Sequence, residues 1–135
     1  MKKLQNLAHA SEDTIYSITA CFPFEFFPDK LIIDKNKVTV IRNHFFLKRT
    51  YPILIEDILT VKFINSYILA SLDFEVKGYE ENPQPIQHLI PRQALKAKQY
   101  IMGLKKAKNE KIDVTMIPLE ELRKRLLEIG GNPQE

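Results

Sequence analysis

The sequence predicts an α+β fold that is mainly β, with one hydrophobic core and two helices near its carboxyl end. Two patterns support this prediction. Short extended stretches with alternating apolar residues follow one another between residues 31 and 90, and apolar residues at helical spacing begin at residue 91. The 135 residues, 44% hydrophobic and 27% charged, have the size and composition of one ordinary globular domain.

Residues 1–29 are expected to be a lead-in segment whose first 13 residues are polar and loosely held. Residues 14–22 are ambiguous, because their β-branched content favours a strand while the spacing of Ile15, Ile18 and Phe22 favours a helical turn. We expect a short helix there.

An aromatic arm follows at residues 22–28, which contain four of the eight phenylalanines and two prolines. The two prolines, at positions 23 and 28, forbid a regular helix and disfavour a central strand, so the arm is expected to be extended. We expect its rings to pack across the core of the domain. The alternative is a partner-binding strip that presents Phe24, Phe26 and Phe27.

Residues 31–64 are predicted to form antiparallel strands. Residues 31–33 and 38–47 form a hairpin, because the Asp and Asn of residues 34–37 suit a tight turn. Residues 49–55 form a third strand, in which Pro52 marks an edge or a bulge. Residues 55–58 turn the corner into a fourth strand, with Leu59, Val61 and Phe63 on one face.

The clearest strand covers residues 68–76, where five apolar residues alternate with polar ones, as in a half-buried antiparallel strand. Residues 78–85 contain glycine, asparagine and two prolines and are predicted to form a loop. Residues 86–90 form a short strand after this loop.

Two amphipathic helices end the chain. The first covers about residues 91–109, with Pro91 at its start and Gly103 as a point of close approach or of weakness. The second covers residues 118–129, between Pro118 and the glycine pair at residues 130–131. Its stripe includes Leu122 and Leu126, which must be buried against the same domain or against a partner.

The order of strands and closing helix resembles the pleckstrin-homology (PH) superfold. More specifically, residues 27–34 (FPDKLIID), 37–42 (KVTVIR) and 55–58 (IEDI) are similar to bacterial PH-like domains, and the resemblance covers residues 27–109. It implies a partly open antiparallel barrel or sandwich of six or seven short strands over residues 30–110, closed by the helix. Residues 111–135 are then a carboxyl-terminal extension.

The resemblance implies a binding function without fixing the ligand, since the superfold hosts phosphoinositide, peptide and protein binding. Phosphoinositide-binding members carry basic residues around the first hairpin, as this chain does. The turn at residues 34–37 looks too tight to form their ligand-embracing loop.

Charge is unevenly distributed. The net charge of +3 arises from −2 over residues 1–29, +1 over 30–91, +6 over 92–111 and −2 over 112–135. The basic segment therefore could attract an anionic partner, either nucleic acid or a membrane surface, although a solvated helix face is the simpler explanation. The candidate anion-binding residues are Lys96, Lys98, Lys105, Lys106 and Lys108.

The sequence lacks the residue patterns of a disulfide, a metal site and a phosphate-binding loop. Cys21 has no second cysteine, the three histidines have no metal-ligand spacing, and the glycines form no phosphate-binding loop. We expect no catalytic residues, no metal, no cofactor and no transmembrane segment, in a protein of the cytoplasm. The leading hypothesis is a non-catalytic PH-like interaction module that binds a protein or peptide, and the alternative is anion binding through residues 92–111.

Overall fold

The computed structural model describes residues 14–21, 27–78 and 84–130. These residues form seven strands, two α-helices and one short 3-10 helix. The predicted α+β fold with mainly β structure is therefore confirmed. The elements in chain order are β1 (Thr14–Thr19), β2 (Lys30–Asp34), β3 (Lys37–His44), β4 (Leu47–Leu54), η1 (Ile55–Asp57), β5 (Ile58–Ser66), β6 (Leu69–Val76), β7 (Ile86–Leu89), α2 (Pro91–Asn109) and α3 (Leu119–Ile129).

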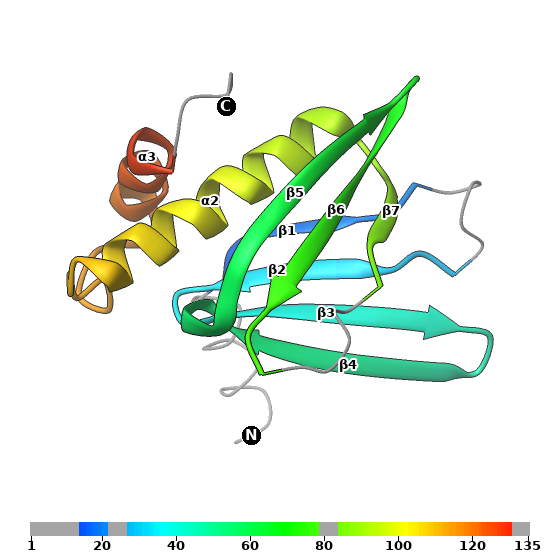
Figure 1. The fold of residues 1–135 in the computed structure, drawn as a ribbon, viewed down its shortest axis with the longest axis horizontal. Coiled ribbons are helices and arrows are strands. Elements are labelled where there is room, and N and C mark those ends of the chain that lie inside the picture. Colours follow the sequence, from blue (N-terminus) through cyan, green and yellow to red (C-terminus); the bar gives the residue numbers. More distant parts are fainter. Residues whose placement is uncertain (1–13, 22–26, 79–83, 131–135) are drawn as a thin grey trace.

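The seven described strands form two antiparallel sheets and no closed barrel. One sheet has the order β1-β2-β3-β4 and the other has the order β5-β6-β7, so neighbours in each sheet are also neighbours in the chain. The 3-10 helix η1 carries the chain from the first sheet to the second at one end of the molecule (Figure 1). A further connection is a backbone hydrogen bond, in which the Cys21 amide donates to the His88 carbonyl oxygen at 2.8 Å.

Helix α2 lies along both sheets and contacts β1, β5 and β6, as Figure 1 shows. The core is enclosed by the inner faces of the sheets and by the apolar side of this helix, which the sequence predicted from its helical spacing. Its fully buried side chains come from every layer and include Leu31, Ile33, Ile53, Ile55, Ile58, Leu72, Phe74, Ile86, Leu89, Ile101 and Leu104.

The expectation of a short helix at residues 14–22 is wrong, because Thr14–Thr19 is strand β1, paired with β2. The spacing of Ile15 and Ile18 has a different cause. The register of β1 shifts between Thr14 and Tyr16, which is a β-bulge, and both isoleucines are buried although they are three residues apart. A bulge adds one residue to a strand and so imitates helical spacing over a short window.

The same effect changes the face assigned to one residue of β5. The register shifts between Ile58 and Thr60, so Ile58 and Val61 are buried while Leu59 is exposed. The prediction that Leu59 and Val61 share a buried face is therefore wrong. The strand itself, and the 3-10 corner that precedes it, are where the sequence predicted them.

The predicted hairpin with a turn at Lys35 and Asn36 is confirmed, but its second strand ends earlier than expected. Strand β3 stops at His44, and Phe45 and Phe46 form a second tight turn into β4. Residues 38–47 are therefore not one continuous strand. Strand β4 is an edge strand, as Pro52 indicated.

Helix α3 docks on α2 within this chain, which answers the question that the sequence left open. Leu122 and Leu126 are each 1% exposed. Gly103 of α2 permits this contact, because a Cβ atom at that position would lie 2.6 Å from the Leu126 carbonyl oxygen. Burying the two leucines stabilises the docked helix by about 1.5–3 kcal/mol each.

Arg123 joins α3 to the first sheet as well. Its guanidinium donates through Nε to the Ile15 carbonyl oxygen at 2.8 Å and through a terminal nitrogen to the Thr14 carbonyl oxygen at 3.2 Å. Lys35 holds the segment before α3 by donating to the Thr115 carbonyl oxygen at 3.0 Å. Arg123 thus occupies two backbone carbonyl groups at the start of β1.

Candidate functional site: the apolar end of the two sheets

Two hairpin turns carry exposed apolar side chains where turns are usually polar. Phe45 and Phe46 form the β3–β4 turn, with Phe45 78% exposed and Phe46 fully exposed. Tyr67 and Ile68 form the β5–β6 turn, with Tyr67 fully exposed and Ile68 71% exposed. Single exposed apolar residues are common on proteins, but two consecutive ones at the tips of two hairpins are not.

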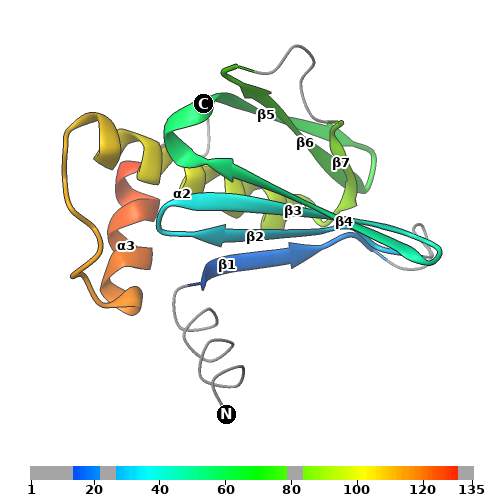
Figure 2. The ribbon, with the colours of Figure 1, turned by 90° about the horizontal axis from the view of Figure 1, so that it is seen from below.

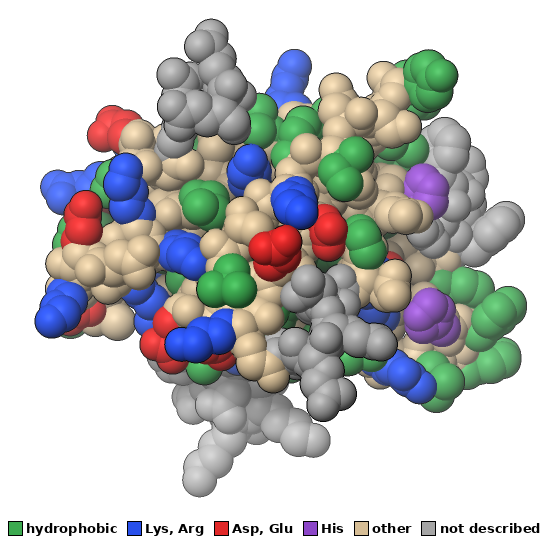
Figure 3. Space-filling model, viewed as in Figure 1, with side chains coloured by type: hydrophobic (Ala, Val, Ile, Leu, Met, Phe, Trp, Pro, Cys, Tyr) green, Lys and Arg blue, Asp and Glu red, His purple; other side chains and the backbone are tan. Residues whose placement is uncertain are grey.

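Both turns lie at the same end of the molecule. Figures 1 and 2 place them at the right-hand end, opposite η1 and the polar β2–β3 turn at Lys35 and Asn36. In the space-filling view, hydrophobic side chains project at the upper and lower right over these two turns (Figure 3). We call this surface the apolar end and define it by Phe27, Phe45, Phe46, Leu47, Tyr67 and Ile68.

The backbone of Phe45 adopts a left-handed conformation with φ of +42°. Two-residue hairpin turns favour glycine or asparagine at positions of positive φ, because a β-carbon is crowded there. The Phe45 ring packs on the Phe27 ring, with 5.1 Å between the ring centres. The end of the aromatic arm and the β3–β4 turn therefore form one apolar surface.

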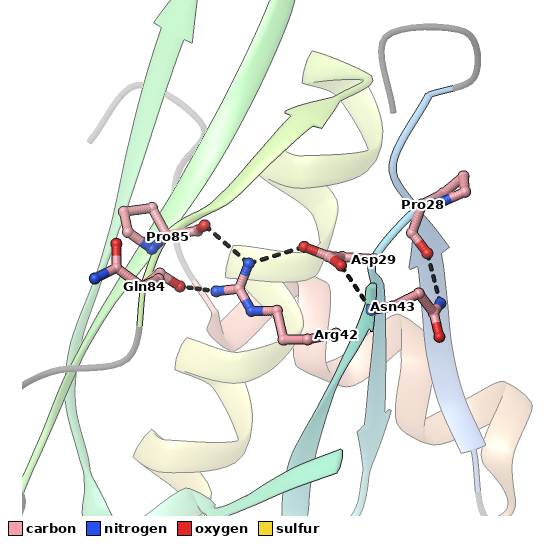
Figure 4. Close-up of polar contacts among 6 residues, drawn as sticks. All are labelled: Pro28, Asp29, Arg42, Asn43, Gln84 and Pro85. Atoms are coloured by element: carbon pink, nitrogen blue, oxygen red, sulfur yellow. Dashed lines mark hydrogen bonds and ion pairs between the residues drawn. The ribbon is translucent and has the colours of Figure 1, made fainter. Parts of the chain in front are cut away.

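A polar cluster behind this surface ties three segments together (Figure 4). The Arg42 guanidinium donates to the Asp29 carboxylate at 2.9 Å, and both side chains are only 14% exposed. Arg42 also donates to the Pro85 carbonyl oxygen at 3.2 Å and to the Gln84 carbonyl oxygen. The cluster fixes the start of β2 and the entry to β7 against β3.

Asn43 completes this cluster from the next position of β3. Its backbone amide donates to the second Asp29 carboxylate oxygen at 3.1 Å, and its side-chain amide donates to the Pro28 carbonyl oxygen at 2.7 Å. Pro28 is thereby held directly after Phe27. The proline and aspartate of the FPD sequence thus hold the last ring of the arm in place.

A cavity of about 350 Å³ lies beside the β5–β6 turn. Tyr67, Ile68 and Leu69 line one part of it, and Gln87 and His88 of β7 line another. His88 has φ of +62°, at the point where the β6–β7 register is irregular. The β5–β6 tip therefore stands beside a hollow lined by these residues.

The predicted lysine-rich surface of α2 is largely used within the molecule. The Lys105 ammonium donates to the carbonyl oxygens of Ile58 and Leu59, the latter at 3.1 Å. The Lys108 ammonium donates to the Asn36 side-chain oxygen at 3.5 Å. Such contacts occupy N–H donors that an external anion would otherwise bind, although both ammonium groups keep their charge.

Lys96 has an aromatic partner. Its ammonium lies 5.7 Å from the ring centre of Tyr16, within cation–π range, and that ring packs on Tyr100. Burial raises the pKa values of both tyrosines above 10.0. Of the remaining two predicted lysines, Lys106 is exposed and Lys98 is half-buried.

The predicted partner-binding residues have three different outcomes. Phe24 and Phe26 lie outside the described residues. Phe27 is 41% exposed and belongs to the apolar end. Leu122 and Leu126 are buried against α2, so a partner cannot reach them while α3 stays docked.

The sequence analysis does not identify the β3–β4 and β5–β6 turns as candidate functional sites, because their tips contain no glycine, asparagine or proline to mark them. One available signal was length. The predicted strands at residues 38–47 and 49–55 leave only Lys48 to connect them. Strands average about five or six residues and hairpin loops need at least two, so the ten-residue strand at 38–47 should contain the turn.

Within the described ranges, no group of three or more His, Cys, Asp or Glu residues could hold a metal ion. Neither described helix combines the length and the apolarity needed to cross a bilayer. Comparison of the chain with protein-family models, curated proteins and solved structures finds no match.

Proposed function

We propose that the chain is a non-catalytic, PH-like interaction module whose partner docks on the apolar end. The observation that carries the proposal is the pair of hairpin tips with exposed apolar residues at one end of both sheets. The order of elements, a four-stranded meander, a three-stranded meander and a long helix, supports the PH-like part of the proposal.

The apolar end is a different surface from the two that the sequence predicted as binding sites, one on α2 and one on α3. Helix α3 is occupied by α2, and three of the five α2 lysines contact groups of the same chain. The Arg42 and Asp29 cluster holds the Phe27 and β3–β4 part of the apolar end in a defined shape, as a binding surface requires.

Site-directed photo-cross-linking tests the proposal. A photoreactive phenylalanine analogue replaces Phe46 or Tyr67 in the full chain, and the protein is irradiated in native extract that still contains membranes. Cross-linked protein or lipid is then identified by mass spectrometry.

Matched control positions are Asn36, in the turn at the opposite end, and Met116, which is exposed and apolar but precedes α3. We expect a specific product from positions 46 and 67 and none from the controls. Products of equal yield at all four positions, or none at positions 46 and 67, would contradict the proposal.

A further inference from the structure

We propose that the partner of the apolar end is an anionic lipid surface, into which the β3–β4 and β5–β6 tips insert. This inference rests on the proposed function and goes beyond it by naming the partner. It is carried by the shape of the two tips, the charge beside one of them and the chemistry of their side chains.

The two tips suit a flat and deformable partner. Phe46 and Tyr67 are fully exposed at the tips of two separate hairpins, and hydrophobic side chains gather at the upper and lower right of Figure 3. A protein would need a matching hollow for each tip, whereas a bilayer interface accommodates both without a complementary shape. Phenylalanine and tyrosine rings also partition well into the layer between headgroups and acyl chains.

The charge pattern of the β3–β4 hairpin fits an anionic surface. Residues 37–54 contain four basic residues and no acidic residue. Lys48 and Arg49 follow the tip and are exposed. Because successive side chains of a strand point to opposite faces, these two residues place positive charge on both faces of the hairpin.

The spacing along the strand agrees with the depth of an interfacial anchor. At about 3.3 Å per residue, Lys48 and Arg49 lie about 7 and 10 Å behind Phe46. An apolar element inserts about 5–10 Å into the interface, so both cations would reach the phosphate layer when the rings are inserted. Near the β5–β6 tip, residues 63–72 carry no charge that would resist insertion.

The backbone of the β3–β4 turn supports the same conclusion. Phe45 occupies a left-handed conformation in which glycine or asparagine would be less crowded. An aromatic residue at such a position has an unfavourable local conformation and yet remains exposed. Conformations of this kind occur where a side chain is needed for contact with a ligand.

The opposite end of the molecule carries charges of both signs. Glu56 and Asp57 of η1 lie at the end away from the two tips (Figures 1 and 2). Helix α3 docks near that same end, beyond the middle of α2 (Figure 1). The same end also carries Lys35, Lys37, Lys105 and Lys108, so the two exposed tips, and not a difference in charge between the ends, would orient the docked molecule.

Tryptophan fluorescence tests this inference directly, because the chain contains no tryptophan. Phe46→Trp, Tyr67→Trp and Met116→Trp each place one reporter in the full-length protein. The vesicles are phosphatidylcholine alone or phosphatidylcholine with roughly 30% phosphatidylglycerol. We expect a blue shift for the reporters at positions 46 and 67 with anionic vesicles, and no shift for the reporter at position 116.

Two sets of variants separate insertion from charge attraction in a vesicle flotation assay. Phe46→Ser should weaken binding about tenfold, since it removes most of one inserted ring, and Met116→Ser should leave binding unchanged. Lys48→Gln and Arg49→Gln should each weaken binding about fivefold at low salt, with Lys37→Gln, at the far end of β3, as the matched charge control. All altered positions are exposed, so the thermal unfolding midpoint should not change.

The outcomes distinguish the inference from the proposed function. No blue shift at positions 46 and 67, together with a specific protein cross-link from those positions, would overturn the lipid partner and keep the interaction surface. Absence of both the shift and any cross-link would overturn both. An equal shift at position 116, or binding unaffected by Phe46→Ser, would show non-specific adsorption and overturn the inference.

Discussion

The close contact between α2 and α3 predicts that Gly103→Ala destabilises the protein, although alanine is the better helix former. An added Cβ would lie 2.6 Å from the Leu126 carbonyl oxygen and 3.2 Å from its Cα. Ordinary contacts between carbon and carbonyl oxygen are about 3.3 Å or longer, so the two helices must separate by about 0.7 Å.

The magnitude follows from the packing that this separation weakens. A gap of about 0.5–1 Å forfeits about a quarter to a half of the dispersion energy between facing atoms. Applied to about 3–6 kcal/mol for Leu122 and Leu126 together, this gives a loss of about 1–3 kcal/mol. Alanine regains about 1 kcal/mol through helix propensity, which leaves a net loss of about 1 kcal/mol.

Urea unfolding followed by circular dichroism measures this difference. The matched control is the reverse change on the same helix, Ala107→Gly, which should also cost about 1 kcal/mol, because Ala107 is buried and its Cβ is accommodated. A Gly103→Ala protein that is more stable by about 1 kcal/mol would show helix propensity acting alone. That result would refute the docking of α3 across Gly103.

Three further predictions concern the core, the polar cluster and pH. Leu126→Ala should reduce the free energy of unfolding by about 2–5 kcal/mol in the same urea assay, whereas Leu127→Ala, at a half-buried position, should cost clearly less. Arg42→Met removes the ion-pair partner of Asp29 and should cost about 1–3 kcal/mol, between the values for exposed and buried pairs; a loss below about 0.5 kcal/mol would show that the cluster contributes little. Burial raises the pKa of Tyr100, so the folded state holds this proton more tightly; the associated stability is complete below about pH 10 and is lost as pH rises through the folded pKa. Tyr100→Phe should therefore flatten the alkaline decline of the unfolding midpoint, while Tyr67→Phe, at an exposed ring, should not, and identical declines in all three proteins would contradict this assignment.

Local chemistry made most elements of the fold predictable. The Asp and Asn around Lys35 located the first hairpin turn, and Pro91 marked the start of α2. Strict alternation identified β6, where Ala70, Leu72, Phe74 and Val76 are all buried. These signals act within a few residues, so a single sequence contains them completely.

The wrong predictions share one physical cause, because they concern features that form only when two strands pair. The bulges at Ile15 and near Leu59 change which side chains face the core, and a bulge is defined by two strands together. The turn at Phe45 was missed because its residues have no turn propensity of their own. The candidate site consists of such residues, so composition and spacing pointed to the lysines of α2 instead.

The order of strands in the two sheets also has a consequence for how the chain folds. Every strand pairs with its neighbour in the sequence, so the pairing of each sheet requires only short loops to close. The bond between the Cys21 amide and the His88 carbonyl, in contrast, joins positions that are distant in the chain. The two meanders should therefore form early as separate cooperative units, and the Cys21 and His88 corner should close in the late step that brings them together.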